Sequence, residues 1–199
     1  MSNLRYDGRQ KQIEDAALHV FTELGFEKLT LESVAEKLGY TKQAIYYYFK
    51  NKEELISSFC LNILKGARDE VVGICLAKEK PEAIMTELIR YYVHGTCLKQ
   101  GFFALHHDLK QILSAINDEN KKKEMYLMMA EIPDCCAAVI RSGIKSGVFR
   151  KEDPNALSGA VFALLGGVVS ITEIQTLKEL SIDKKVELIT DIILRGIKV

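Results

Sequence analysis

The chain has 199 residues, which is enough for one or two domains with a sizeable hydrophobic core. Its 27 lysines and arginines are balanced by 27 aspartates and glutamates, so the net charge does not indicate a nucleic-acid partner. The N-terminal stretch has no apolar signal segment, and five cysteines without metal-ligand spacing are typical of a reducing compartment, so we expect a cytoplasmic protein without a cofactor.

A long first helix is predicted to end at Gly25. Its apolar residues recur at helical spacing, as Ile13, Ala16, Ala17, Val20, Phe21 and Leu24. Glycine is the preferred residue just after a helix, because it adopts the left-handed conformation that ends one. We expect Phe26, which follows the glycine, to fold back into the core.

Two short helices are predicted next, over 31–38 and 42–48. Thr30 and Thr41 precede them, and a threonine hydroxyl can accept a hydrogen bond from a free N–H of the first turn. Gly39 supplies the turn between them. The apolar stripe of the first helix consists of Leu31, Val34, Ala35 and Leu38. This is the layout of a helix-turn-helix.

The second short helix is predicted to have two different faces. Ile45 and Phe49 point together toward the core, at 100° per residue. The other face carries Gln43, Tyr46, Tyr47 and Lys50. Amide, phenol and ammonium groups suit base edges and phosphate oxygens. Aromatic residues on a helix are more often core, as we expect for Tyr48, so the capped frame predicts the DNA interface more strongly than any one tyrosine.

The rest of the chain is predicted to be helical. Asn51 and Glu54 have the spacing of a capping pair at the start of a fourth helix, and Pro81 opens a fifth. Further helices are predicted over 103–113, 117–147, 154–175 and 182–196, with a turn at 146–149. Pro133 should kink or split the helix over 117–147. No alternating strand pattern competes, so the predicted fold class is all-α.

The block from Ile13 to Phe59 resembles the DNA-binding domain of the TetR (tetracycline repressor) family of bacterial regulators. The matching residues are Ala17, Phe21, Gly25 and Phe26, then Thr30, Val34, Ala35 and Gly39, and finally Ile45, Tyr46, Tyr48, Phe49, Lys52, Glu53 and Leu55. The resemblance implies a three-helix helix-turn-helix DNA-binding domain over residues 1–51. It also implies a helical effector-binding and dimerisation domain over residues 52–199.

The resemblance also implies which residues contact DNA. Lys42 and Gln43 would open the recognition helix in the major groove, with Tyr46, Tyr47 and Tyr48 near the backbone or the bases. Phosphates would be held by Thr30, Thr41, Lys50 and Lys52. Many family members carry a small residue, often glycine, where this chain has Gln43. Glutamine can bond adenine through two hydrogen bonds, so Gln43 is expected to read a base.

The middle helices carry a group of aromatic, methionine and histidine residues. They are Tyr91, Tyr92, His94, Cys97, Phe102, Phe103, His106, His107, Met125, Tyr126, Met128 and Met129. Such side chains suit an adaptable apolar pocket, and the resemblance implies an effector site here. Plain hydrophobic core is the alternative. No metal is expected, because adjacent histidines on a helix diverge by about 100° and no cysteine or carboxylate completes a ligand set.

The helix from Pro154 is apolar nearly all round and must bury more than one face. With the last helix it could form half of a two-fold four-helix dimer interface, as the resemblance implies. The residues expected there are Leu157, Val161, Leu164 and Val168, with Val186, Ile189, Ile192 and Ile193 from the last helix. Burial inside the monomer is the alternative. The stretch 156–171 is short for a membrane span and contains serine and glycine, so no membrane partner is expected.

The functional prediction is a DNA-binding transcriptional regulator. By the resemblance it would be a homodimeric repressor that holds two recognition helices about one DNA turn, ~34 Å, apart on a near-palindromic double-stranded operator, and a small-molecule effector would release it. The alternative is an all-α small-molecule binding or carrier protein, which leaves residues 30–52 without a purpose. Catalysis is not expected, because no nucleophile elbow, phosphate loop, paired-carboxylate motif or metal spacing occurs.

Overall fold

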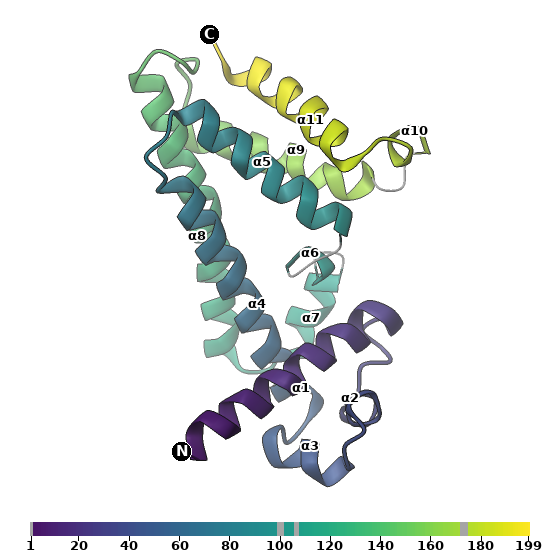
Figure 1. Ribbon diagram of the computed structural model, residues 1–199. Coiled ribbons are helices and arrows are strands. Elements are labelled where there is room, and N and C mark those ends of the chain that lie inside the picture. The colour runs from purple at the N-terminus through teal and green to yellow at the C-terminus, as the bar shows by residue number, and fades with distance from the viewer. Residues whose placement is uncertain (1, 99–101, 106–107, 172–174) are drawn as a thin grey trace. The chain divides into compact units, whose positions relative to one another are not determined.

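The computed structural model describes residues 2–98, 102–105, 108–171 and 175–199, without the side chains of 2–5, 102, 104, 168–171 and 175–176. Its helices are α1 (Ser2–Leu24), α2 (Leu31–Leu38), α3 (Lys42–Tyr48), α4 (Lys52–Cys75), α5 (Pro81–Leu98), α6 (Phe102–Leu105), α7 (Leu109–Ala115), α8 (Glu119–Lys145), α9 (Pro154–Ile171), α10 (Gln175–Lys178) and α11 (Ile182–Ile197) (Figure 1). Within the described ranges the only extended pairing is an isolated bridge between Phe149 and Lys198. The all-α prediction is confirmed.

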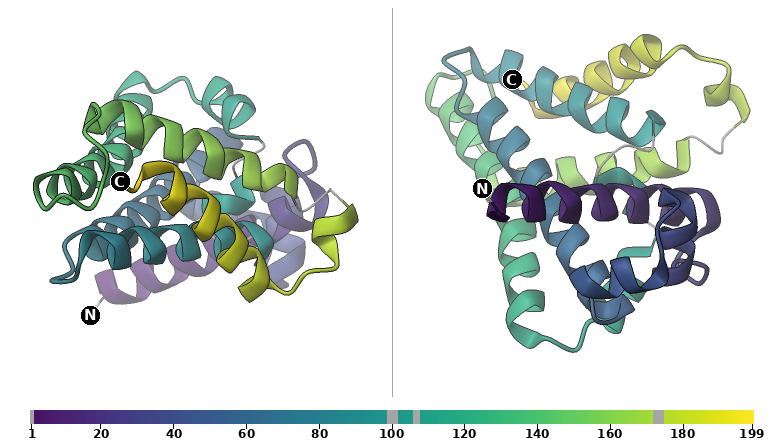
Figure 2. Two further views of the ribbon diagram at one scale, coloured as in Figure 1. Left: turned by 90° about the horizontal axis from the view of Figure 1, so that it is seen from above. Right: turned by 60° about the horizontal axis from the view of Figure 1, so that its bottom comes forward.

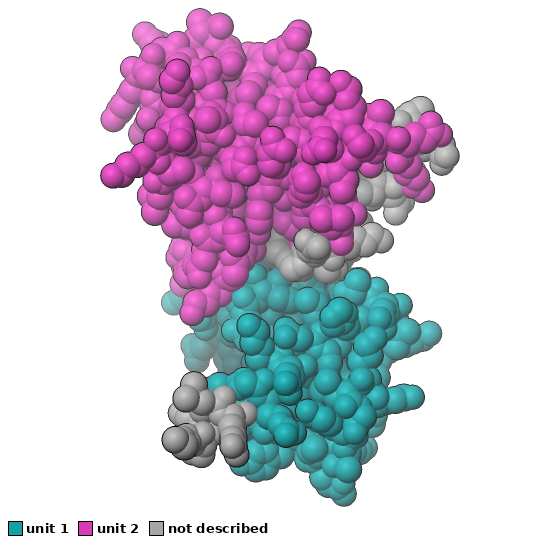
Figure 3. Space-filling model, in the orientation of Figure 1, with its two compact units in different colours: residues 1–64, 105–126 teal, residues 65–104, 127–199 magenta. Residues whose placement is uncertain are grey.

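The chain forms two compact units (Figure 3). Unit 1 contains residues 1–64 and 105–126, and unit 2 contains residues 65–104 and 127–199. Helices α4 and α8 therefore each contribute to both units. The division predicted after residue 51 falls between α3 and α4 and concerns roles in binding, so it stays a prediction.

The core of unit 1 is built around α1. The predicted stripe is buried from Ile13 to Phe21, whereas Leu24 is 49% exposed. Helix α1 ends at Gly25, whose φ of 84° lies in the left-handed region. Phe26 is only half-buried, and the fully buried residue after the turn is Leu29. The chain thus returns to the core three residues later than predicted.

Within unit 1, polar side chains connect α1 to α4, and α4 to the segment just before α8. Glu14 of α1 is 6% exposed, and its carboxylate accepts hydrogen bonds from Ser58 Oγ and Asn62 Nδ2 of α4, both at 2.6 Å. Glu53 accepts from the backbone N–H of Asn117 at 2.6 Å and from its side-chain amide at 2.8 Å. These bonds satisfy a buried carboxylate and an N–H just before α8, and both groups would be costly to leave unpaired.

In unit 2, α5 packs against α9 and α11 (Figure 1, Figure 2). Two glycines let aromatic rings approach the helices closely. A Cβ on Gly95 would lie 2.1 Å from the ring of Phe103, and one on Gly143 would lie 2.1 Å from the ring of Phe149. Phe149 is fully buried, so it can use this space only because Gly143 has no side chain. No described helix is both long and apolar enough to span a membrane.

One predicted helix is divided in the structure, and the helix that Pro133 was expected to kink or split is not split. The segment 103–113 was predicted as one helix, but it contributes to α6 and α7. Asp108, with φ −99° and ψ 4°, is the N-cap of α7 and lies outside the helical region. Pro133 does not split the helix over 117–147, because α8 runs from Glu119 to Lys145. Its buried stripe continues across the proline, as Ile132, Cys136 and Ile140.

Candidate nucleic-acid interface

Local hydrogen bonds set the ends of α2 and α3 where the sequence predicts them. Thr30 Oγ1 accepts from the N–H of Ser33 at 3.0 Å, and Ser33 Oγ accepts from the N–H of Thr30 at 2.9 Å. This reciprocal cap fixes the first turn of α2. Gly39 has φ 65° and donates its N–H to the last turn of α2, and Thr41 Oγ1 accepts from the N–H of Ala44 at 3.3 Å. The predicted caps of both helices are confirmed.

Buried residues on one side of α3 and at its C-cap hold the helix in place. Ile45 is fully buried and Phe49 is 1% exposed, as predicted. A second set, which we call the outward face of α3, consists of Lys42, Gln43, Tyr46 and Tyr47 of the helix together with Lys50, which follows its C-cap; all are exposed. Tyr47 is 72% exposed and Tyr46 is 41% exposed. Exposed phenol, amide and ammonium groups on a helix that is fixed from behind can reach base edges and phosphates.

Tyr6 of α1 joins the tyrosines of α3. Its ring centroid lies 4.8 Å from that of Tyr48 and 6.0 Å from that of Tyr47, and Tyr47 and Tyr48 lie 5.1 Å apart, edge to face. Tyr48 packs on these two rings but is only half-buried, so it is less buried than the predicted core position. Tyr6 was not predicted, because its only signal is an aromatic residue in an otherwise polar N-terminal stretch. Such ring pairs orient Tyr47 without burying it.

Glu32 of α2 contacts two residues of the outward face. Its carboxylate forms an ion pair with Lys42 and accepts a hydrogen bond from the Tyr46 hydroxyl at 3.4 Å. Lys42 Nζ also lies 5.5 Å from the centroid of the Tyr46 ring. The hydrogen bond with Lys42 lowers the pKa of Glu32 and raises the pKa of Lys42, so both groups are ionised at neutral pH. Glu32 was not predicted, because nothing in the spacing of residues 32 and 42 links them.

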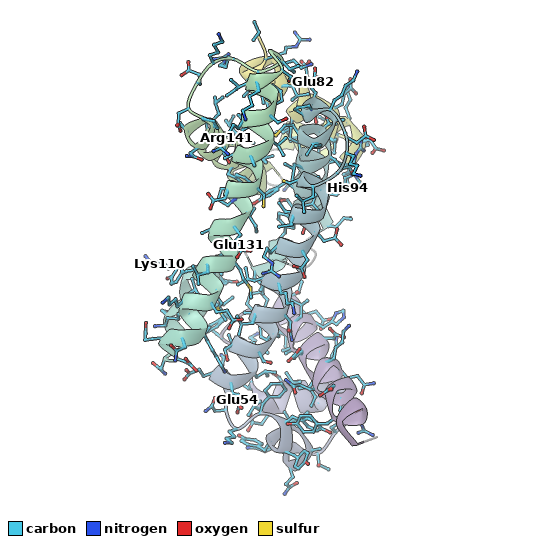
Figure 4. All side chains as sticks on the ribbon, turned by 90° about the vertical axis from the view of Figure 1, so that its left-hand side faces the viewer. Glu54, Glu82, His94, Lys110, Glu131 and Arg141 are labelled. Atoms are coloured by element: carbon cyan, nitrogen blue, oxygen red, sulfur yellow. The ribbon has the colours of Figure 1, made fainter. Side chains whose placement is uncertain are left out.

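The other two predicted lysines have different surroundings. Lys50 is exposed, and no described acidic side chain pairs with its ammonium. Its backbone N–H donates at 2.7 Å to the carboxylate of Glu54, which is labelled in Figure 4. Asn51 Oδ1 accepts from the N–H of Glu54 at 2.8 Å and caps the start of α4. Lys52 donates to the carbonyl of Phe26 at 2.8 Å and lies 4.4 Å from the centroid of its ring. Burial lowers the pKa of Lys52, and its ammonium is already bound within unit 1.

The predicted effector residues are only partly brought together. Tyr91, Tyr92 and Phe103 form an aromatic cluster in unit 2, with ring centroids 5.0–6.4 Å apart, and Phe162 joins it at 5.4 Å from Tyr92. Burial raises the pKa of the Tyr92 phenol, so it stays a hydrogen-bond donor. Phe162 was not predicted, because it comes from α9.

The remaining predicted effector residues are dispersed. Met125, fully buried, and Tyr126, 55% exposed, belong to unit 1, whereas Met128 is buried in unit 2. His94 Nε2 lies 4.0 Å from Asp183 Oδ1. The predicted positions that fall outside the described side chains are Phe102, His106 and His107; among the described ones, Cys97 and Met129 are half-buried. No group of His, Cys, Asp or Glu in the described part of the chain could hold a metal ion.

A cavity of about 820 Å³ lies between α4 and α5 of unit 2. Its lining consists of Gly66, Asp69, Glu70, Gly73, Ile74, Ala77, Glu79, Ala83, Ile84 and Glu87. None of these belongs to the predicted effector residues. Small side chains on facing helices leave this space, and that pattern was not recognised in the sequence.

The residues predicted at the dimer interface lie on two different faces. Val161 of α9 and Ile189 and Ile193 of α11 are 2%, 8% and 3% exposed. They are buried because α9 and this side of α11 both pack against α5. Leu157 is half-buried, Leu164 is 56% exposed, and the side chain of Val168 lies outside the described residues. Ile192 of α11 is 58% exposed, and Leu188 of the same helix, 40% exposed, was not predicted.

Two family models match the chain. One, described as bacterial regulatory proteins of the tetR family, matches residues 13–59, and the other, described as the QacR-like protein C-terminal region, matches residues 107–199. RutR of Escherichia coli K12, an HTH-type transcriptional regulator, is 27% identical over 209 aligned positions that cover 96% of this chain and 91% of RutR.

Solved structures share the fold. A TetR/AcrR-family transcriptional regulator from Thermobifida fusca is 25% identical, with a TM-score of 0.68 over 95% of this chain and 98% of its own. A protein from Saccharomonospora viridis in complex with choline is 20% identical and has a TM-score of 0.75 over 97% of this chain and 99% of its own. Both contain the helical arrangement that presents α3 here.

Proposed function

Because the chain belongs to the TetR family of bacterial transcriptional regulators, we propose that it is a homodimeric repressor whose two α3 helices read a near-palindromic operator. The chain is a DNA-binding regulator. What we propose is how it binds its operator and what releases it from that DNA. The observation that carries the proposal is the outward face of α3, where Gln43, Tyr47 and Lys50 are exposed while Ile45 and Phe49 anchor the helix.

In the operator complex, each group on this face has a separate role. Gln43 hydrogen-bonds a base edge, because its amide is both donor and acceptor. Lys50 holds a phosphate, and the hydroxyls of Thr30, Thr41, Tyr46, Tyr47 and Tyr48 are near enough to the helix ends to add contacts to the backbone. Lys52 contributes through its position at the start of α4, since its ammonium is bound to the carbonyl of Phe26.

Dimerisation uses the apolar side chains that unit 2 leaves exposed. Leu164 of α9 and Leu188 and Ile192 of α11 are each at least 40% exposed, and α9 adds small residues such as Gly159 that allow close helix packing. This face replaces the predicted set of Val161, Ile189 and Ile193, which are needed for the core of the unit. Two copies then carry two recognition helices, as two half-sites require.

A small molecule in unit 2 is proposed to release the operator. The aromatic cluster of Tyr91, Tyr92 and Phe103 offers an apolar wall with phenol groups, which suits a small organic effector. A protein of the same fold has been solved in complex with choline, which supports the proposal that this chain binds a small molecule. The signal would pass along α4, which contributes to both units, and effector and operator would weaken each other's binding by the same factor.

A gel-shift assay tests the proposal. We expect the protein to retard the DNA upstream of its own gene at a salt concentration where a scrambled duplex of the same length is not retarded. The band should weaken steeply as salt rises, because phosphate contacts release counterions. Equal retardation of both duplexes would contradict operator recognition. An all-α carrier without a DNA role would give no salt-sensitive band at all.

A further inference from the structure

The carboxylate of Glu32 lies where it can compete with DNA for a lysine. Glu32 is in the first turn of α2, yet its side chain reaches the outward face of α3 and pairs with Lys42. The two side chains are 49% and 58% exposed, so the pair adds little to folding stability.

The pair removes a cation from the surface that faces DNA. Of the three lysines expected to contact DNA, Lys42 is neutralised by Glu32 and Lys52 is bound to the Phe26 carbonyl, so Lys50 alone has no described partner. Lys37 of α2 is likewise paired, with Glu23 at 2.8 Å. Non-specific binding depends on uncompensated cations near phosphates, and this surface keeps few of them.

The same carboxylate also orients two groups for directional contact. Glu32 accepts from the Tyr46 hydroxyl at 3.4 Å while it holds Lys42, whose ammonium lies 5.5 Å from the Tyr46 ring centroid. Lysine has a flexible stem, and a fixed ammonium loses less conformational freedom when it meets one base or one phosphate oxygen. Both effects raise specificity. Neutralising Lys42 weakens complexes with non-operator DNA, and orienting Lys42 and Tyr46 favours the operator complex.

We propose that Glu32 is a specificity-determining residue, which suppresses binding to non-operator DNA by neutralising Lys42 and positions Lys42 and Tyr46 for the operator. This inference rests on the proposed DNA-reading role of α3. Its quantitative consequence concerns salt. Freeing one ammonium adds about one phosphate contact per DNA-binding head, which steepens the salt slope by about 0.9 per head. Between 50 and 200 mM salt that is a further loss of affinity of about 3.5-fold per head, or about 12-fold for a dimer.

The test compares Glu32→Gln with Glu36→Gln. Glu36 lies on the same helix, is exposed and makes no described side-chain contact, so the control removes the same charge without freeing Lys42. Binding is measured by fluorescence anisotropy, with a duplex selected from a random pool by the wild-type protein and a scrambled duplex of the same composition. Thermal unfolding confirms that each variant is folded, and Glu32→Ala provides a second variant of the same site.

We expect Glu32→Gln to bind the scrambled duplex several-fold more tightly at low salt, and its affinity should fall more steeply as salt rises. The ratio of its affinity for the selected duplex to its affinity for the scrambled duplex should be lower than in the wild-type protein. Glu36→Gln should keep the wild-type ratio, and in a Lys42→Met background Glu32→Gln should leave the salt slope unchanged. Equal effects of the two glutamate variants, or a steeper salt slope in Glu32→Gln without Lys42, would overturn the inference. A wild-type protein that selects no duplex would overturn the proposed function as well, whereas selective wild-type binding with an unchanged ratio in Glu32→Gln overturns only the role of Glu32.

Discussion

Gln43 and Lys50 both belong to the outward face, but their chemistry makes them suited to different tasks. An amide has a donor and an acceptor in one plane, so its bonds depend on which base edge it meets. An ammonium attracts any phosphate oxygen. Both side chains are exposed and neither is engaged with another described group, so substitution should alter binding without altering the fold.

Gln43→Ala should relax sequence preference at one position of each half-site. The amide can bond adenine through two hydrogen bonds, and a bidentate contact of this kind discriminates by about 1–3 kcal/mol. Relative affinities across a panel of single-base operator variants provide the measurement. A panel whose ranking and spread match those of the wild-type protein would show that Gln43 reads no base.

Lys50→Ala should weaken binding to all duplexes by a similar factor and reduce the salt slope by about 1 for each head. The physical reason is the loss of one phosphate contact with its counterion release. Affinity measured against salt concentration checks this on operator and scrambled duplexes. The same slope as the wild-type protein would mean that the Lys50 ammonium lies away from the phosphates.

At the scale of elements, the turn between α2 and α3 decides how the recognition helix is presented. Gly39 ends α2 with φ 65° and donates to the carbonyls of Ala35 and Glu36. Thr30 and Thr41 fix the starts of the two helices through side-chain caps. The geometry of the pair thus depends on bonds between residues three to five positions apart, and it needs no long-range contact to begin forming.

Gly39→Ala should destabilise the protein by about 1 kcal/mol, because a Cβ is strained in the left-handed region. Gly8→Ala is the matched control. Gly8 lies inside α1 with open space around it, so alanine there should stabilise the helix by up to about 1 kcal/mol. Urea unfolding followed by circular dichroism measures both. Shifts of the same sign for the two variants would contradict the assigned role of the Gly39 turn.

At the scale of the whole molecule, function depends on what unit 2 leaves exposed. The inner side of α11 is used within the subunit, where Val186, Ile189 and Ile193 are buried in a core that α5 and α9 share. Leu164, Leu188 and Ile192 remain exposed and apolar. Two recognition helices can occupy two half-sites together only if a second copy covers such a face.

Ile192→Asp should convert the proposed dimer to a monomer and reduce operator affinity at least tenfold. A charge at the centre of an apolar interface would be desolvated without a partner, which costs several kcal/mol. Leu76→Asp is the control, since Leu76 is 76% exposed after the end of α4. Sedimentation velocity at micromolar concentration gives the masses. A monomeric wild-type protein, or a dimeric Ile192→Asp variant, would contradict the proposed interface.

Features that depend on residues close together in the chain could be predicted from the sequence. The caps at Thr30 and Thr41, the turn at Gly39 and the buried edge of Ile45 and Phe49 were all predicted, because helix period and capping act over three or four residues. The prediction of a single helix over 103–113 was wrong, since the helical periodicity continues through Asp108, whose backbone lies outside the α-helical region.

The sequence by itself determined the helix-turn-helix and its exposed face, since hydrogen bonds and periodicity within one or two helices fix them. Only the tertiary structure decided that Glu32 neutralises Lys42, that Tyr6 packs on the tyrosines of α3, and that Ile189 and Ile193 are core residues. In each case the partner lies on another helix. A helix with two apolar or two polar edges does not specify which edge its neighbour covers, and that choice is made by the packing of all the helices together.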